Sequence, residues 1–419
     1  MDINLLANPT RVSTPFIKVT IGDYVFGVYN ESGIKRNNLG SYEVKLFQYP
    51  NYIQSLQIIK INGKFNQYTL TINYPITENN DPNFFEKVFS TVSKSRKIKF
   101  SYGDLSAPQF LYKEEEAMIT KISNSFNVSS AVITYTVSAI SVGKLATATT
   151  FNFTSSEFTG LHQPSAIIKK LLKRNDKYGL QDIFTGMRNL DLVESLGLIP
   201  SNDIEVELKS QTNISVLDYI SYLVRSMRNH ARKSLYTIVV IDDTSGVLSG
   251  PYFKIVDTMK SSDSIDTYSL VIGYPSQNIV TEFNIDNNDS FSILYNYSKE
   301  LNTNEYIVRI DDEGNENKIY SPNITSNNDE QITHSNDINW WNNVTSFPIN
   351  ATVKLKGVLR PTILMTKVKL SVLFYGNAHV SSGLYLINKQ VDTVDSNGCW
   401  TTLNLVRIDG DHENFKDFL

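Results

Sequence analysis

The sequence predicts a mainly β protein that carries an α/β insertion. Tyrosine and phenylalanine are abundant, with 23 and 21 of the 419 residues, and valine, isoleucine and threonine are frequent as well. These residue types favour strands, whereas the many asparagines and serines favour turns. Alternation of apolar and polar residues, typical of half-buried strands, recurs in both halves of the chain, and helical spacing is concentrated between them.

The N-terminal region, to about residue 150, is expected to form a sheet with one short helix. Apolar residues recur at helical spacing in 82–93, after an Asp-Pro pair that suits a helix start. This helix is expected to cover a sheet face or a barrel opening. Alternating segments predict strands at 17–29, 42–49, 53–61, 68–74, 97–102 and 117–140, the last with a turn at 124–127.

The middle of the chain predicts helices packed with a hairpin. Residues 166–172 place four apolar side chains on one helical side, and residues 213–232 carry the strongest helical pattern of the chain. Ser215 is the expected N-cap of this second helix, and basic residues at its end suit the negative end of the helix dipole. Segments 235–241 and 252–257, with turn residues between them, predict a hairpin.

The last third predicts strands again, interrupted by a polar segment. Residues 305–310 and 318–320 flank an acidic turn and predict a hairpin, and the Asn- and Ser-rich stretch 321–339 predicts an exposed loop. Further strands are predicted at 269–274, 278–285, 290–296, 352–359, 367–375, 383–392 and 401–407.

Charge and cysteine content exclude several classes of protein. The formal net charge is -4, which disfavours a basic protein that tracks nucleic-acid phosphates. Cys399 is the single cysteine, so neither an internal disulfide nor a cysteine-rich zinc site can form. No signal sequence and no apolar run long enough to span a membrane is present. We therefore expect synthesis in a cytoplasm and no membrane insertion.

Acidic and glycine-bearing motifs were weighed as candidate sites. Residues 311–315 resemble part of a calcium loop but lack the distal glutamate, so a hairpin turn is the better interpretation. Residues 114–116 are three consecutive glutamates, which cannot easily converge from one strand and are expected at an exposed edge or in a loop. Residues 246–250 lack the G-x-S-x-G spacing of a nucleophile elbow.

Basic and aromatic motifs favour structural roles. The basic residues of 169–177 could contact nucleic acid or an acidic partner, but a solvated helix face is the preferred interpretation. Trp340 and Trp341 could stack on a sugar ring or a protein partner, or equally form a buried cover over the last sheet. Cys399 is expected to be a structural thiol. No catalytic, cofactor-binding or metal-binding residue is identified, and we do not expect an enzyme.

The C-terminal strands carry a more specific pattern. A strand that ends in a glycine and a proline is followed by a G-x-Y-x-I strand, and the chain closes with a strand of the form T-x-L-x-L-x-R. This pattern resembles the end of phage baseplate hub proteins, and the order of regions along the chain is similar as well. The residues that match are Gly357, Pro361, Gly383, Tyr385, Ile387, Trp400, Thr401, Leu403, Leu405 and Arg407.

The resemblance implies two tube-like antiparallel β-barrel domains plus smaller inserted domains. The first barrel would span 1–155, the α/β insertion 156–262, the second barrel 263–300 and 346–419, and an inserted hairpin and polar loop 301–345. Hub proteins form a homotrimer whose six barrels match the six-fold tail tube above and whose three-fold symmetry matches the central spike below. The implied partners are the tail tube or a tube-initiator protein, the spike and other baseplate proteins, in the virion, without nucleic-acid sequence recognition.

Two other functions are kept as alternatives. A distal tail or tube-end protein would form a hexamer and carry only one tube-like barrel. A glycan-binding or glycan-cleaving β protein would use Trp340, Trp341 and the acidic turns to line a groove, with converging carboxylates if it cleaves its ligand. The oligomeric mass and the number of tube-like units distinguish these alternatives from the hub.

Overall fold

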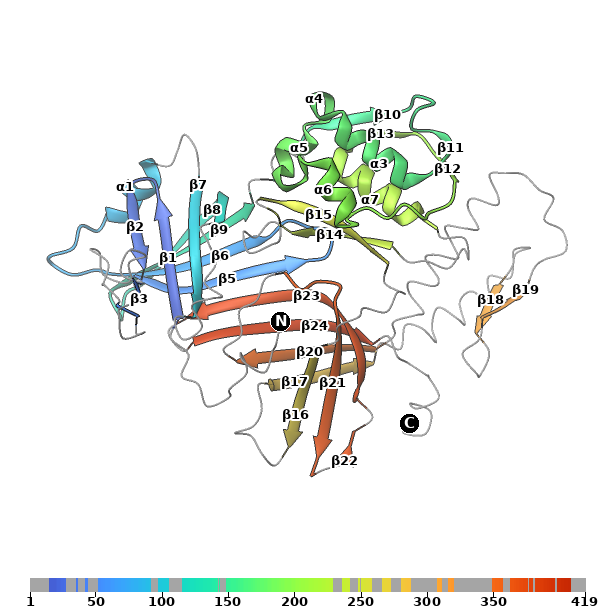
Figure 1. Cartoon of the computed structure of the whole chain (residues 1–419). Coiled ribbons are helices and arrows are strands. Elements are labelled where there is room, and N and C mark those ends of the chain that lie inside the picture. Colours follow the sequence, from blue (N-terminus) through green and yellow to red (C-terminus); the bar gives the residue numbers. More distant parts are fainter. Residues whose placement is uncertain are drawn as a thin grey trace.

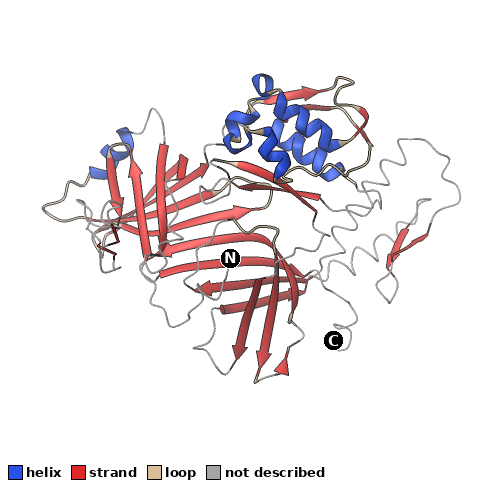
Figure 2. Cartoon of the chain, in the orientation of Figure 1, coloured by secondary structure: helices blue, strands red, loops and turns tan. Residues whose placement is uncertain are grey.

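The computed structural model is mostly β, with one large antiparallel sheet and a cluster of helices beside it (Figures 1 and 2). No helix among the described residues is long and apolar enough to cross a membrane. The structure describes residues 15–27, 35–36, 42–43, 52–91, 97–104, 115–141, 143, 148–228, 236–241, 248, 250–257, 266–272, 280–287, 307–310, 316–319, 349–356, 362–375, 377–379, 381–395 and 398–407.

Among the described residues the main sheet contains 14 strands, which come from the first and the last third of the chain. Its hydrogen-bonded path runs through β17 (Val280–Asn287), β20 (Ile349–Lys356), β24 (Gly398–Arg407), β23 (Gly383–Asp395), β5 (Ile53–Ile61), β6 (Gln67–Pro75), β9 (Val132–Ser141), β8 (Glu115–Asn127), β7 (Lys97–Asp104), β1 (Pro15–Ile21) and β2 (Tyr24–Gly27). β21 (Lys367–Phe374) pairs with β23 and also holds β16 (Asp266–Ile272) and β22 (Asn377–Ala378). Across the described residues the path stays open, so closure into barrels remains a prediction.

The strands form because their apolar residues alternate. In β9 every second residue is buried, and β24 repeats the same pattern over its length. Helix α1 (Phe84–Thr91) covers the sheet as predicted, with Phe85 and Val88 fully buried and Phe85 packed against Tyr135 of β9. The sequence therefore placed both the sheet and its covering helix correctly.

Three details of the N-terminal region differ from the predictions. The segment 17–29, expected as one strand, is divided into β1 and β2 by a turn at Gly22 and Asp23, where Gly22 has a φ of 58°. The turn expected at 124–127 lies at 128–131, because β8 continues to Asn127. The side-chain oxygen of Asn127 accepts hydrogen bonds from the backbone N–H groups of Ser129 and Ser130, at 3.1 and 3.2 Å, and so begins the turn one residue after the strand. Of the strand expected at 42–49, the described part is β4 (Tyr42–Glu43), which pairs with β3 (Lys35–Arg36).

The middle of the chain forms the predicted mixture of helices and short strands. Its elements are β10 (Thr150–Phe153), β11 (Gly160–His162), α3 (Pro164–Lys173), α4 (Asn175–Tyr178), α5 (Leu180–Ile183), the 3-10 helix η4 (Thr185–Met187), α6 (Leu190–Ser195), β12 (Val206–Leu208), β13 (Gln211–Ser215), α7 (Val216–Ser226), β14 (Tyr236–Ile241) and β15 (Tyr252–Asp257). β14 and β15 form the expected antiparallel hairpin. β18 (Ile307–Ile310) and β19 (Glu316–Ile319) form the second expected hairpin.

Helix α7 begins at its predicted cap and ends early. Ser215 Oγ accepts the backbone N–H of Asp218 at 3.1 Å, as expected of an N-cap. The helix was predicted to reach residue 232, but it ends at Ser226 because Met227 adopts an extended backbone and is buried. The buried Arg228 guanidinium then donates to the carbonyl oxygens of Arg225 and Met227, at 2.8 and 2.6 Å.

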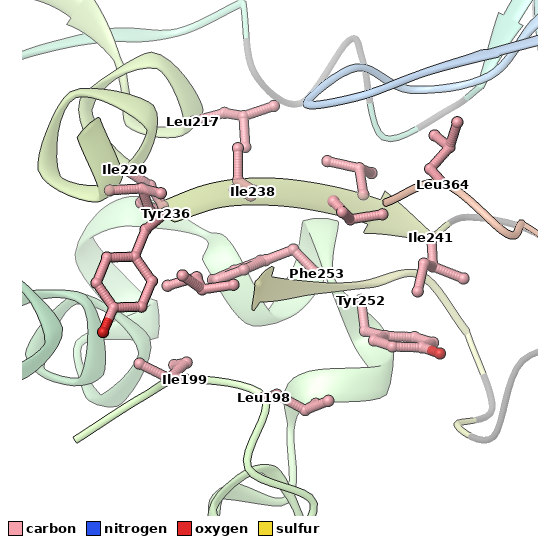
Figure 3. Packing of buried hydrophobic residues seen from close by; sticks show 14 of the residues in the cluster. Leu198, Ile199, Leu217, Ile220, Tyr236, Ile238, Ile241, Tyr252, Phe253 and Leu364 are labelled. Atoms are coloured by element: carbon pink, nitrogen blue, oxygen red, sulfur yellow. The ribbon is translucent and has the colours of Figure 1, made fainter. Parts of the chain in front are cut away.

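One hydrophobic cluster connects the insertion with the C-terminal strands. Figure 3 shows Leu217 of α7 directed toward Ile238 of β14, and Leu364 close to Ile241 at the end of β14. Leu364 precedes β21 and is 1% exposed, so the C-terminal β region contributes to the same core as the helices. This shared core includes residues from both sides of the boundary expected at residue 262. The domain boundaries remain predictions.

Two sets of five strands in the main sheet are connected in the same way. The first unit, defined as β5 to β9, has the order β5–β6–β9–β8–β7 across the sheet. The second unit, defined as β17, β20, β21, β23 and β24, has the order β17–β20–β24–β23–β21. All neighbours within each unit are antiparallel. In both units the chain fills the same five sheet positions in the same sequence.

The two units also carry β-bulges at matching positions. β8 and β23 have 13 residues each, and their registers with β9 and β24 shift around the sixth residue, which is Thr120 and Asn388 respectively. β5 and β17 carry a second shift, around Gln54 and Thr281. A bulge adds an unpaired residue and bends its strand, so both units bend at both places.

The registers on either side of the bulges agree as well. Ile72 of β6 lies opposite the fourth residue of β9, and Leu355 of β20 lies opposite the fourth residue of β24. Beyond the five strands the units differ, since β1 is antiparallel to β7 whereas β16 is parallel to β21. The chain therefore contains an internal structural repeat of five strands, with different neighbours at its outer edge.

Candidate assembly interface

The two units meet along β23. Residues 383–386 of this strand pair with β21, and residues 389–395, after the bulge at Asn388, pair with residues 55–61 of β5. β24 pairs with β23 on its opposite edge, on both sides of the bulge. Figure 1 shows β23 lying between β24 and β5. The bulge thus lets one strand belong to the second unit and join it to the first.

A buried ion pair lies at this junction. Lys60 of β5 and Asp392 of β23 are both 0% exposed, and Lys60 Nζ lies 3.2 Å from Asp392 Oδ2. Gln390 Nε2 donates to both carboxylate oxygens, at 3.1 and 3.0 Å, and Thr401 Oγ1 donates to Oδ1 at 2.7 Å. The carboxylate therefore has partners from β5, β23 and β24.

The electrostatics of the ion pair favour a structural role. Burial raises the pKa of Asp392, while the nearby Lys60 ammonium and the hydrogen bonds from Thr401 and Gln390 lower it. Moving two charges out of water costs several kcal/mol per ion, which their attraction repays only when the remaining hydrogen bonds are made. A shift of one residue between β5 and β23 would turn these side chains to opposite faces. The cluster therefore fixes the register in which the two units join.

Apolar residues surround the ion pair. Leu56 of β5 lies opposite Val394 of β23, and both are fully buried in the core of the first unit. Cys399 of β24 belongs to the same core, and its thiol donates to the backbone oxygen of Gly103 at 3.5 Å. This buried position suits the structural role expected for the single cysteine.

The described residues of the C-terminal pattern lie in or next to this junction. Thr401 binds Asp392, and Tyr385 is buried with its hydroxyl donating to the backbone oxygen of Ser381 at 2.8 Å. Arg407 donates to the backbone oxygen of Ser382 at 3.3 Å. Gly383 begins β23, and Ile387, Leu403 and Leu405 are buried in the core. Gly357 and Pro361 lie outside the described residues.

Trp400 is half-buried and faces basic side chains. Lys354 Nζ lies 5.0 Å from the centre of its ring, and Lys356 Nζ lies 6.0 Å away. Both lysines belong to β20, beside β24, and cations attract the face of an indole ring at such distances. Trp400 therefore stabilises the β20–β24 pair.

Sequence reasoning missed the other half of the junction. Lys60 and Gln390 were not singled out, although both are fully buried, and Asp392 was noted only as the end of a strand. The available signal was Lys60 itself, which stands on the apolar face that Leu56 and Ile58 form in β5. A charged residue in a buried series needs a partner, but its partner lies far along the chain.

The consecutive glutamates are placed differently from the prediction. Glu115 was expected at an exposed edge, but it is 2% exposed on β8. Its carboxylate accepts hydrogen bonds from the hydroxyls of Tyr68 and Tyr102, at 2.7 and 3.1 Å. Tyr102 comes from the adjacent strand β7 and Tyr68 from β6, which lies beyond β9, so two other strands supply the partners that make burial possible. Glu116 points to the opposite face and pairs with Lys97 at 2.6 Å.

Three of the five basic residues in 169–177 are paired with acids. Glu157 binds Lys170 Nζ at 2.7 Å. Its two carboxylate oxygens also accept hydrogen bonds from the two terminal nitrogens of Arg174, at 2.7 and 2.8 Å. The hydrogen bonds from Lys170 and Arg174 lower the pKa of Glu157 to about 2. Lys169 lies 3.7 Å from Glu194. These pairs reduce the free positive charge that a nucleic acid would need, in keeping with a solvated helix face.

A cavity of about 550 Å³ lies between the β5–β6 connection and the insertion. Its lining includes Asn62, Arg225 and Thr237, and Asp218 is the one carboxylate among its residues. Ser215 already donates to Asp218 at 2.6 Å. The carboxylate pair that a glycan-cleaving enzyme needs is therefore absent from this cavity.

The remaining candidate motifs give no site in the described part of the chain. There, no cluster of three or more histidine, cysteine or acidic side chains is close enough to hold a metal ion. Residues 311–315, Trp340 and Trp341 lie outside the described residues, as do Glu114 and the strand expected at 290–296. Of the segment 246–250, residues 248 and 250 are described, and neither belongs to a helix or strand.

Comparison with known proteins gives similarity only in three dimensions. No protein-family model matches the sequence, and no curated protein matches it. The 43 kDa tail protein of prophage MuSo2 from Shewanella oneidensis is 10% identical, with a TM-score of 0.48 over 94% of this chain and 98% of its own. A tail protein from Neisseria meningitidis is 8% identical, with a TM-score of 0.46 over 94% and 96%. The Francisella PdpA–VgrG complex contains a chain that is 11% identical, with a TM-score of 0.45 over 97% of this chain and 55% of that one. We transfer no function on similarities of this size.

Proposed function

We propose that this chain is a structural hub subunit of a phage tail baseplate. Its role is to form a trimeric ring that adapts the six-fold tail tube to the three-fold central spike. The observation that carries the proposal is the internal repeat, because one chain holds two five-strand units with the same order, registers and bulges. Three such chains supply six similar units, the number that a six-fold tube requires.

Two further observations support the proposal. The C-terminal residues that resemble hub proteins, Tyr385 and Thr401 among them, lie at the junction of the two units or in the adjoining core. The junction itself is held by strand pairing and a buried ion pair, which suit a fixed connection between two units of one ring. A tube-end protein with one barrel would not need the second unit, so the repeat favours the hub over that alternative.

The proposal places the protein in the virion, as a non-enzymatic component of the baseplate. Its partners are two further copies of itself, the tail tube or its initiator, the central spike and other baseplate proteins. The upper face of the ring contacts the tube and the lower face contacts the spike.

The oligomeric mass in solution tests this function. Light scattering after gel filtration, across a concentration series, is expected to give three times the 47.4 kDa of the chain. Electron micrographs of the trimer are then expected to show a ring with six similar lobes around its lumen. A hexameric mass, or a strict monomer at every concentration, contradicts the proposal.

A further inference from the structure

The internal repeat leaves two strand edges open that are paired in the matching unit. Residues 389–395 of β23 pair with β5, but the matching residues of β8, 121–127, have only β9 as a strand partner among the described residues. Similarly, β5 pairs with both β6 and β23, whereas β17 pairs with β20 alone in the described part of the sheet. The open edge of β8 thus matches the β23 side of the β5–β23 junction, and the open edge of β17 matches the β5 side.

Burial differs between the matching edges in the same way. Residues 390, 392 and 394 of β23 are buried, while their counterparts Ile122, Asn124 and Phe126 are exposed. Phe126 is 66% exposed although it matches Val394, which is fully buried. On the other edge, Ile285 of β17 is 38% exposed although it matches Ile58, which is 0% exposed. Apolar residues on an open edge indicate a surface that another strand covers.

We propose that β17 of one copy of this chain pairs antiparallel with residues 121–127 of β8 in the next copy. The pairing repeats the β5–β23 junction, so its register follows from that junction. Val394 lies opposite Leu56 and Asp392 opposite Ile58. The same register places Phe126 opposite Phe283 of the next copy, and Asn124 opposite Ile285 of the next copy.

A second copy fits these edges better than an unrelated partner. The two edges belong to the same molecule and match the two sides of a contact that the molecule already makes within itself. The contact is heterologous, since β17 and β8 are different surfaces, and repeated heterologous contacts close into a ring when their rotation allows it. The number of copies in that ring rests on the proposed function; the pairing does not.

Neither member of the Lys60–Asp392 ion pair has a charged counterpart at the open edges. The positions that match Lys60 and Asp392 are occupied by Asn287 and Asn124, which are both neutral. Losing one member of the ion pair alone would leave a buried charge without a partner, at high cost. With asparagine at both positions, no unpaired charge is buried when two folded chains form the contact.

Cysteine cross-linking between two singly substituted chains tests the register. The proposed pairing puts Ser125 directly opposite Asn284 of the next copy, and both residues are exposed in the single chain. Directly opposite residues of antiparallel strands have Cα atoms about 4.5–5.5 Å apart, within the range of a disulfide. Mixing Ser125→Cys with Asn284→Cys and oxidising is expected to give a covalent dimer, which neither variant gives alone.

A register control uses Ile285→Cys in place of Asn284→Cys. Ile285 belongs to the opposite strand face, so its mixture with Ser125→Cys is expected to give at least about tenfold less cross-linked dimer. Equal cross-linking of both mixtures overturns the register. A ring of three copies in which Ser125→Cys and Asn284→Cys form no disulfide overturns the pairing and leaves the proposed function standing. The disulfide in an assembly of another size supports the pairing and contradicts the hub.

A charge on the edge provides an independent test. Phe126→Asp is expected to leave the single chain folded, because Phe126 is 66% exposed there, but to weaken association more than about tenfold by burying a carboxylate. Val128→Asp is the matched control, since Val128 is 93% exposed in the turn after β8 and lies beyond the paired residues. Light scattering across a dilution series measures both variants. Association of Phe126→Asp at the strength of the control overturns the proposal.

Discussion

Replacing Lys60 by methionine tests how the two units are held together. The substitution Lys60→Met keeps most of the side-chain volume and removes the ammonium that lies 3.2 Å from Asp392 Oδ2. Gln390 and Thr401 still donate to the carboxylate, but its charge is no longer balanced. Because Asp392 is fully buried, the carboxyl group is expected to take up a proton instead of remaining charged.

The cost of that proton gives the magnitude. The ordinary pKa of the group is 3.8, and each pH unit above it costs about 1.4 kcal/mol when the folded chain holds the proton. At pH 7 the loss of unfolding free energy is therefore at most about 4 kcal/mol, because burial already raises the pKa of Asp392 when Lys60 is present, and this limit lies within the range for breaking a buried pair. A raised pKa in the folded state favours stability at low pH and costs stability as the pH rises. The loss is thus expected to fall to at most about 2 kcal/mol at pH 5.

Urea denaturation at pH 5 and pH 7 measures this difference. Because a chain of this size need not unfold in one step, hydrogen exchange of residues 53–61 and 389–395 reports the junction directly. Lys87→Met, which removes an ion pair on the surface, is the control and is expected to show no resolvable change at either pH. A loss for Lys60→Met that is equal at both pH values would refute the reasoning, as would no loss at pH 7.

Three further predictions concern the insertion. Ser215→Ala is expected to lower the unfolding free energy by about 1 kcal/mol through loss of the α7 N-cap, while Ser221→Ala, inside the helix, is expected to have little effect in the same urea titration. Leu171→Ala is expected to cost about 2–5 kcal/mol because its side chain is 0% exposed, against less than about 0.5 kcal/mol for Leu161→Ala, where the side chain is 64% exposed. The carboxyl of Glu157 is expected to titrate with a pKa of about 2 by NMR, so its contribution to stability is present above pH 4.5 and is lost as the pH falls toward 2; a midpoint near 4.5 would contradict the observed ion pairs.

Local patterns in the sequence predicted most of the individual elements. Alternation identified the strands of both units, and Ser215 marked the start of α7, because burial periodicity and capping act over a few residues. The end of α7 was not predictable in this way. It depends on Met227 entering the core and on Arg228 binding the last carbonyl oxygens of the helix.

Contacts between distant strands could not be predicted from local patterns. The burial of Glu115 depends on two tyrosines from other strands, and the junction depends on pairing between β5 and β23. The internal repeat is hidden for a related reason. When β8–β9 is matched to β23–β24, three positions carry the same residue, which are Ile119 with Ile387, Lys121 with Lys389, and Thr136 with Thr402. Order, register and bulges are kept while side chains differ, so the repeat is visible only in the pairing.

The position of Lys60 also matters while the chain is being made. β5 leaves the ribosome long before β23, because the whole insertion and most of the second unit lie between them in the sequence. During that time the outer edge of β5 has no β23 to cover it, and an uncovered apolar edge invites pairing with other nascent chains. A lysine on the inward face of an edge strand makes such pairing costly, since it would bury an unbalanced charge. Asp392 supplies the balancing charge when β23 pairs with β5. The same lysine therefore disfavours aggregation through the edge of β5 at first, and later allows pairing with β23.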